Sequence, residues 1–332
     1  MASLVLGGLG FIGASLVEEL AGWSRDVCVV ARRSSAERRK RLLDRVAEKG
    51  ARILLYPELD KPSLRDALNK CGGSVEAYYL IGVLRNDRPA WKAHVEMAAI
   101  ALEALSSGLE SFVYVSAAPV VAECSSLERS SEGRVVEEEE HLENCSPPRL
   151  GFLASKYAGE KLVLEMLGEY GVKGGIARPV LVYGPHAYGH VEWLLLYRLA
   201  RRGISLDLSI DVVYSRDVAR ALVHIARRAR RQWYYVASPS RYTLGDLWSG
   251  VARAYSPRPR RAAGRVFLEA LFSALYRIGA QSRVSLVGAF VEKRLSFYPA
   301  RLLEEGFRGW ETGSREAVEE FMAWLEREYG RE

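Results

Sequence analysis

The feature that most constrains the fold is a short apolar segment followed at once by three evenly spaced glycines. Ser3 to Leu6 form the apolar segment, and Gly7, Gly10 and Gly13 follow. Apolar side chains then recur at helical spacing up to residue 21. A strand, a glycine turn and a helix in this order bring backbone N–H groups close to a dinucleotide pyrophosphate, because a helix N-terminus attracts an anion. The segment therefore predicts a dinucleotide-binding unit.

The alternation of strand and helix continues well beyond this unit. Short apolar segments that predict strands recur at 27–31, 53–55, 77–81, 112–115 and 175–177. Segments with helical spacing lie between them, at 35–48, 62–70, 90–106 and 152–170. Such alternation is typical of a parallel sheet covered on both faces. We predict an α/β fold with a doubly wound Rossmann sheet in a first domain over residues 1–183.

After residue 184 the pattern becomes mostly helical. We predict a smaller substrate or partner domain from residues 184–206 and 238–332, with the chain returning to the first domain at about 207–237. Its helices are expected at 191–202, 215–229, 243–254, 264–278 and 314–328, with short strands near 212–213 and 234–236. Four aromatic residues are expected to line an apolar pocket or the core, namely Phe267, Phe272, Tyr276 and Phe290.

Composition and charge narrow the class of protein. The chain has 332 residues, with 47 Lys and Arg against 41 Asp and Glu and a formal net charge of +6. No apolar run is long enough to cross a membrane and no signal peptide precedes the first strand, so we expect a cytoplasmic location. Arginine clusters at 38–41 and 227–231 are a candidate RNA-binding feature. They lie on separate predicted helices, and we interpret them as solvated helix faces.

The four cysteines, Cys28, Cys71, Cys124 and Cys145, match no metal-binding spacing. Cys28 lies in an apolar run and is predicted to be a core residue. Cys124 and Cys145 bracket a polar segment, where a disulfide is an option, but we expect the two not to pair.

The end of the second predicted strand bears on which dinucleotide binds. Proteins that bind NAD commonly place a carboxylate there, which accepts hydrogen bonds from the adenosine ribose. Here Ala31 is followed by Arg32 and Arg33, and guanidinium groups pair well with phosphate. We therefore predict NADP(H) over NAD(H). The alternative is that both arginines are ordinary surface charges.

Motifs along the chain resemble, in order, those of the extended short-chain dehydrogenase/reductase family, also called the NAD-dependent epimerase/dehydratase family. Leu6 to Gly13 resembles its glycine signature, and later motifs match at 58–60, 80–82, 112–116, 154–160, 178–185 and 214–219. The resemblance covers nearly the whole chain. It implies a nicotinamide cofactor and a nucleotide sugar or hydrophobic carbonyl substrate. It also implies a homodimer formed through the long helices at 90–106 and 152–170.

The resemblance further implies which residues contact the cofactor. They lie in the glycine turn and near the ends of the later strands: Gly7, Gly10, Phe11, Ile12, Gly13, Arg32, Arg33, Glu58, Leu59, Gly82, Ser116, Lys156 and Pro179.

The two catalytic positions depart from the family pattern. The family's catalytic Tyr precedes its Lys by four residues, and counting back from Lys156 gives Phe152. The position of the catalytic Ser or Thr is taken by Ala118. A phenyl ring exchanges no proton, and loss of a general acid/base costs about 10²–10⁴ in rate. The sequence thus implies a protein that keeps Lys156 for cofactor binding but has lost or changed the standard reaction.

A second Tyr-x-x-x-Lys frame offers an alternative. Tyr157 and Lys161 have the same spacing, and as the active pair they would make the protein an ordinary enzyme. On a helix, Tyr157 is turned about 140° away from Phe152, so only one frame faces the cofactor. The Ala-Ser-Lys context of Lys156 favours the first frame.

Other side chains are candidates to replace the missing groups. Ser116 and Tyr183 are the first candidates, and His94, His186 and His190 are further ones. The function is then a cofactor-binding protein with lost or non-standard catalysis, an active NADP-dependent oxidoreductase or epimerase, or an RNA-binding relative.

Overall fold

The computed structural model describes most of the chain: residues 1–23, 26–84, 88–122, 124, 135–136, 145–148, 151–188, 190–229, 233–261, 270, 274, 288, 290–291 and 295–330. Apart from residues 270 and 274, the helix expected at 264–278 lies outside the described residues, as do Phe267, Phe272, Tyr276 and residues 230–231 of the second arginine cluster. Phe290 is described, and it is buried against Phe297.

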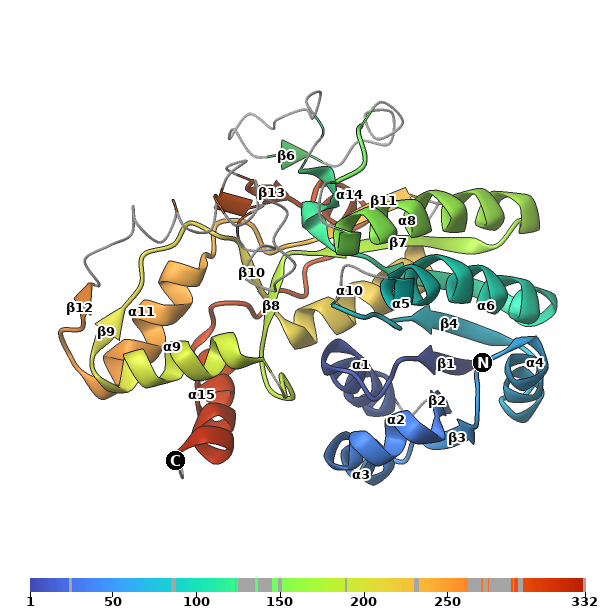
Figure 1. Ribbon diagram of the computed structural model, residues 1–332, viewed down its shortest axis with the longest axis horizontal. Coiled ribbons are helices and arrows are strands. Elements are labelled where there is room, and N and C mark those ends of the chain that lie inside the picture. Colours follow the sequence, from blue (N-terminus) through green and yellow to red (C-terminus); the bar gives the residue numbers. More distant parts are fainter. Residues whose placement is uncertain are drawn as a thin grey trace.

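A seven-stranded, wholly parallel sheet forms the centre of the molecule (Figure 1). In the order of the sheet, its strands are β11 (Trp233–Ala237), β7 (Lys173–Pro179), β5 (Leu109–Val115), β4 (Val75–Tyr79), β1 (Ala2–Leu6), β2 (Val27–Arg32) and β3 (Arg52–Tyr56). The strand order reverses beside β1, which makes the sheet doubly wound. A ligand of such a sheet binds at the carboxyl ends of the strands, near this reversal.

Helices cover both faces of the sheet, which is why its strands are continuous apolar segments. One face carries α1 (Phe11–Gly22), α2 (Arg33–Arg38), α3 (Lys40–Glu48) and α10 (Ser215–Arg228). The other carries α4 (Lys61–Lys70), α5 (Arg88–Trp91), the π-helical turn η1 (Lys92–Glu96), α6 (Met97–Leu105) and α8 (Gly151–Tyr170). The predicted Rossmann fold is confirmed.

The C-terminal part contains further helices that lie together beside the sheet, at the left of Figure 1. These are α9 (Val191–Arg201), α11 (Leu244–Tyr255) and α15 (Arg315–Tyr329), while the short α14 (Ala300–Glu304) contacts β11. Small two-stranded sheets pair β8 (Leu181–Tyr183) with β10 (Val212–Tyr214), β9 (Ile204–Ser205) with β12 (Arg260–Arg261), and β6 (Val135–Val136) with β13 (Phe297–Tyr298). The chain returns to the main sheet through β11, and the division into two domains remains a prediction.

Two predicted helices are interrupted. The helix expected at 35–48 breaks at Arg39, whose backbone leaves the helical conformation (φ −123°, ψ 39°) between α2 and α3. The helix expected at 90–106 is divided into α5, η1 and α6, followed by the 3₁₀ turn η2 (Ser106–Gly108). In both places the local apolar spacing is helical, and it does not reveal the break.

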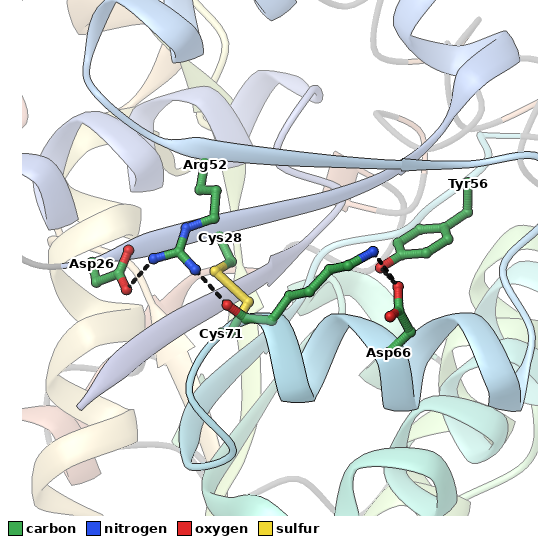
Figure 2. The surroundings of a disulfide bond; sticks show 7 residues. Asp26, Cys28, Arg52, Tyr56, Asp66 and Cys71 are labelled. Carbon is green, nitrogen blue, oxygen red and sulfur yellow. Dashed lines mark hydrogen bonds and ion pairs between the residues drawn. A yellow bond between two sulfur atoms is a disulfide. The ribbon is translucent and has the colours of Figure 1, made fainter.

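All four cysteines form disulfides, which corrects our expectation for Cys124 and Cys145. Cys28 is buried as predicted, but it is also bonded to Cys71 at the C-terminal end of α4 (Figure 2). Beside this bond Arg52 contacts both Asp26 and the carbonyl of Lys70. The disulfide therefore fastens the C-terminal end of α4 to β2.

Among the helices that the structure describes, none is both long and apolar enough to span a lipid bilayer.

Candidate functional site

The glycine turn after β1 has the geometry that a phosphate group requires. Gly7 has a φ of +95°, and a Cβ there would lie 2.7 Å from the carbonyl carbon of Leu80. A Cβ on Gly13 would lie 2.3 Å from the carbonyl oxygen of Gly7. Gly10 precedes α1 without a side-chain cap, and no acidic residue stands in the first turn. The N–H groups at the start of α1 therefore remain available to an anion.

Arg39 lies against this turn, which the sequence did not single out. Its Nη1 donates a hydrogen bond of 2.9 Å to the carbonyl oxygen of Leu9. The same nitrogen is 3.7 Å from the position that a Cβ on Gly10 would take. The break between α2 and α3 lies at this residue. The arginine cluster at 38–41 was the only signal, and nothing in it distinguishes Arg39 from its neighbours, which are exposed as Arg39 itself is.

Gly82, His94 and Lys156 meet beyond the end of β4. A Cβ on Gly82 would lie 3.5 Å from His94 Nε2 and 3.8 Å from Lys156 Nζ. His94 Nε2 accepts a hydrogen bond from Val83 N, while Nδ1 lies 2.8 Å from Ser155 Oγ. Because Ser155 Oγ donates to the Phe152 carbonyl, it accepts from His94 Nδ1. Burial, together with the charge of Lys156, lowers the pKa of His94 to about 2, so the imidazole is neutral.

Lys156 is buried on α8, with an exposed fraction of 4%. Its Nζ donates to the carbonyl oxygen of Val115 at 2.6 Å and lies 4.9 Å from the ring centre of Tyr114. Burial lowers the pKa of Lys156 to about 7, against an opposing effect of Glu160. Next to Val115, the buried Ser116 Oγ finds no hydrogen-bond partner among the described residues. Such a hydroxyl is suited to bind a polar ligand.

Two apolar side chains belong to the same candidate site as His94, Lys156 and Ser116. Phe152 is buried, and its ring meets the His94 ring edge to face at 5.3 Å between centres. Ala118 is fully buried at the start of the 3₁₀ turn η3 (Ala118–Val121). Neither side chain has a group that exchanges a proton.

The second Tyr-x-x-x-Lys frame is directed elsewhere. The Tyr157 hydroxyl donates to the carbonyl oxygen of Cys145 at 3.1 Å. Lys161 lies over the Tyr157 ring, with its Nζ 5.3 Å from the ring centre. Phe152, by contrast, contacts His94, which is next to Lys156. Which of the two frames faces the cofactor remains a prediction.

A buried ion pair holds α8 against β7. Arg178 donates to both carboxylate oxygens of Glu160, at 3.0 and 2.6 Å, and both side chains are almost fully buried. The Arg178 guanidinium also lies 3.8 Å from the ring centre of Tyr234. This pair fixes the helix that carries Lys156.

The remaining predicted cofactor residues lie around the carboxyl edge of the sheet. Arg32 and Arg33 are exposed at the junction of β2 and α2. Glu58 is exposed in the turn after β3, and Leu59 beside it is partly buried. The others lie in the first turn of α1 or at the end of β7: Phe11, Ile12 and Pro179.

Three further candidates have other contacts. The Tyr183 hydroxyl accepts a hydrogen bond from Gly313 N, and its ring packs against Tyr214 and Phe321. His186 pairs with Glu18, and His190 with Glu192. These contacts account for where the three side chains lie, and a catalytic role for any of them remains a prediction.

The fold and site define a Rossmann protein with a glycine turn before α1 and a buried lysine at the carboxyl edge of its sheet. The model of the NAD dependent epimerase/dehydratase family matches residues 3–237, and the chain belongs to this family. No sequence among the curated proteins matches the chain significantly.

Solved structures of similar fold include several sugar-nucleotide enzymes. The UDP-glucose 4-epimerase of Thermotoga maritima, solved with UDP-glucose, is 17% identical with a TM-score of 0.68, and the match covers 99% of each chain. The UDP-glucose 4-epimerase of Thermus thermophilus, in complex with NAD, is 21% identical (TM-score 0.64; 97% of this chain and 99% of that one). The dTDP-glucose 4,6-dehydratase of Bacillus anthracis, also with NAD, is 15% identical (TM-score 0.68; 98% and 97%). At these identities the likeness establishes the fold.

Proposed function

We propose that this protein binds a nicotinamide dinucleotide, with NADP(H) preferred, and that it has lost the Tyr-dependent proton transfer of its family. The observation that carries the proposal is the buried Phe152 against His94, next to Lys156. The open N-terminus of α1, the unpartnered Ser116 hydroxyl and the Lys156 ammonium suit a dinucleotide. When bound, the nicotinamide would supply hydride transfer.

The preference for NADP(H) rests on positive charge near the glycine turn. Arg32 and Arg33 follow β2 where a carboxylate would favour NAD, and Arg39 adds a guanidinium at the turn itself. We expect Arg39→Ala to weaken NADPH binding about tenfold, because a hydrogen bond to a charged group contributes about 1.5–3 kcal/mol. NADH binding should change less. Fluorescence titration measures both constants, with Arg38→Ala as the matched control. An equal loss for both cofactors would contradict the phosphate contact.

A second function is favoured by the lowered pKa of Lys156. A buried amine with a pKa of about 7 exchanges a proton readily at neutral pH. The alternative is therefore an active NADP-dependent oxidoreductase or epimerase that acts on a nucleotide sugar or a hydrophobic carbonyl compound. RNA binding has the least support, because Arg227 of the second cluster approaches Glu76 at 3.6 Å and lies over the Trp23 ring.

The two functions are separated by restoring the family's catalytic residues. We expect the wild type to convert neither UDP-glucose nor dTDP-glucose above background. The double variant Phe152→Tyr with Ala118→Ser should raise the rate of conversion about 10²-fold or more above that background. Product chromatography measures conversion, and Phe152→Leu with Ala118→Ser is the control without a hydroxyl at position 152. Conversion by the wild type would support the alternative. A double variant without any activity would contradict the view that the family's reaction was lost through these two positions alone.

Two further parts complete the proposal. A homodimer through α6 and α8 predicts a mass of twice 37.1 kDa by light scattering.

The proposed location is cytoplasmic. Because most cytosolic proteins keep their thiols reduced, the thiol content of protein extracted under alkylating conditions tests whether both disulfides exist in the cell.

A further inference from the structure

The Cys124–Cys145 disulfide lies next to the candidate site. Cys124 follows η3, which begins at Ala118, and its N–H donates to the carbonyl of Val121 at 3.0 Å. Its partner Cys145 accepts a hydrogen bond through its own carbonyl from the Tyr157 hydroxyl. Tyr157 directly follows Lys156 on α8. The disulfide thus connects the segment after η3, which carries Ala118, to Cys145, and the hydrogen bond from Tyr157 connects Cys145 to α8, which carries Lys156.

These contacts form a closed ring. From Val115 the chain runs through Ser116 and η3 to Cys124, and the disulfide leads to Cys145. The hydrogen bond to Tyr157 leads to α8, and Lys156 closes the ring by donating to the Val115 carbonyl at 2.6 Å. The disulfide is the covalent crosslink of this ring. Ser116 N donates to the carbonyl oxygen of Ala177 at 2.7 Å, so reduction of the disulfide removes the covalent link on the η3 side of the ring and leaves this contact in place.

The two disulfides differ in their accessibility. Cys28 and Cys71 have exposed fractions of 0% and 2%. Cys145 is 8% exposed, whereas Cys124 is only half-buried. Thiol–disulfide exchange requires a thiolate to reach a sulfur atom in line with the bond. A reductant in solution therefore meets the Cys124–Cys145 bond first.

We propose that Cys124–Cys145 is a redox-active disulfide whose exchange with a dithiol controls the affinity of the adjacent dinucleotide site. One thiolate of the dithiol attacks a cystine sulfur and forms a mixed disulfide. The second thiolate of the dithiol then attacks the mixed disulfide. The dithiol becomes a cyclic disulfide, and Cys124 and Cys145 remain in the protein as two thiols. Two electrons and two protons pass to the protein. The inference rests on the proposed dinucleotide binding.

The direction of the effect follows from preorganisation. With the ring closed, Ser116 and Lys156 are held in place before a ligand arrives, and less conformational entropy is lost on binding. The oxidised protein should bind NADPH more tightly, by roughly 5- to 10-fold. Because such coupling is reciprocal, bound NADPH should protect the Cys124–Cys145 bond from reduction by the same factor.

The test titrates NADPH into oxidised protein and into protein treated with dithiothreitol, and counts thiols by alkylation and mass spectrometry. We expect two alkyl groups per chain, both at Cys124 and Cys145, and a dissociation constant raised 5- to 10-fold. The variant Cys124→Ser with Cys145→Ser should bind like the reduced protein and ignore dithiothreitol. Circular dichroism checks that it is folded.

The outcomes distinguish the two proposals. Equal affinity in the two redox states, with the Cys124–Cys145 thiols alkylated, would overturn the coupling and leave dinucleotide binding intact. A double Ser variant that still responds to dithiothreitol, or prior reduction of Cys28–Cys71, would also overturn it. Absence of NADPH binding by the oxidised protein would overturn the proposed function and the coupling together.

Discussion

At the residue scale, the burial and protonation of Lys156 bear most directly on function. Its ammonium group is buried and has one carbonyl acceptor, Val115, in the described contacts, while Phe152 stands where a hydroxyl would be expected. Burial makes the charged form costly, and its pKa falls from 10.5 to about 7. His94 beside it is held neutral, since Val83 N donates to its Nε2.

The lowered pKa of Lys156 predicts how stability depends on pH. Below pH 7 the amine is protonated in both states, and the cost of burying its charge is fully present. Between about pH 7 and pH 10.5 the unfolded state binds more protons, so this cost falls as the pH rises. We expect Lys156→Met to raise the free energy of unfolding more at pH 6 than at pH 10. Denaturant unfolding at both pH values measures the difference.

A difference between the variant and the wild type that is constant over this range would contradict the lowered pKa. Lys161→Met, on the same helix but at an exposed position, is the control and should show little pH-dependent change.

At the scale of elements, α8 and η3 position the site. The helix at 152–170 was predicted closely, and the structure places it at Gly151–Tyr170. Helical spacing predicts that only one of the two Tyr-x-x-x-Lys frames faces the cofactor, and the Ala-Ser-Lys context of Lys156 favours the first. The break at Arg39 was not predictable, because an arginine that contacts a neighbouring turn and one that contacts water have the same local sequence pattern.

The Glu160–Arg178 pair predicts how firmly α8 is held. Glu160→Gln should reduce the free energy of unfolding by about 3–5 kcal/mol, because it leaves the Arg178 charge buried without its counter-ion. Equilibrium denaturation measures the loss. Glu165→Gln on the exposed side of α8 is the matched control and should change stability little. A loss in the Glu160 variant no larger than in the control would show that the pair does not anchor the helix.

On the scale of the whole molecule, the alternation of strands and helices was sufficient to predict the doubly wound sheet and the edge where its site lies. The pairing of Cys28 with Cys71 was not predictable, because 43 residues separate them and four cysteines allow three connectivities. The convergence of Gly82, His94 and Lys156 likewise depends on three distant segments that only the folded sheet brings together. The proposed loss of the family's proton transfer rests on Phe152 and Ala118, which the sequence already displayed.

The most direct test of the central claim is calorimetric titration of the oxidised protein with NADPH, NADP⁺, NADH and NAD⁺. The account predicts micromolar binding, tighter for the two phosphate-bearing forms. Absence of binding by all four would contradict it, and would make the Rossmann fold of this protein a scaffold without its cofactor.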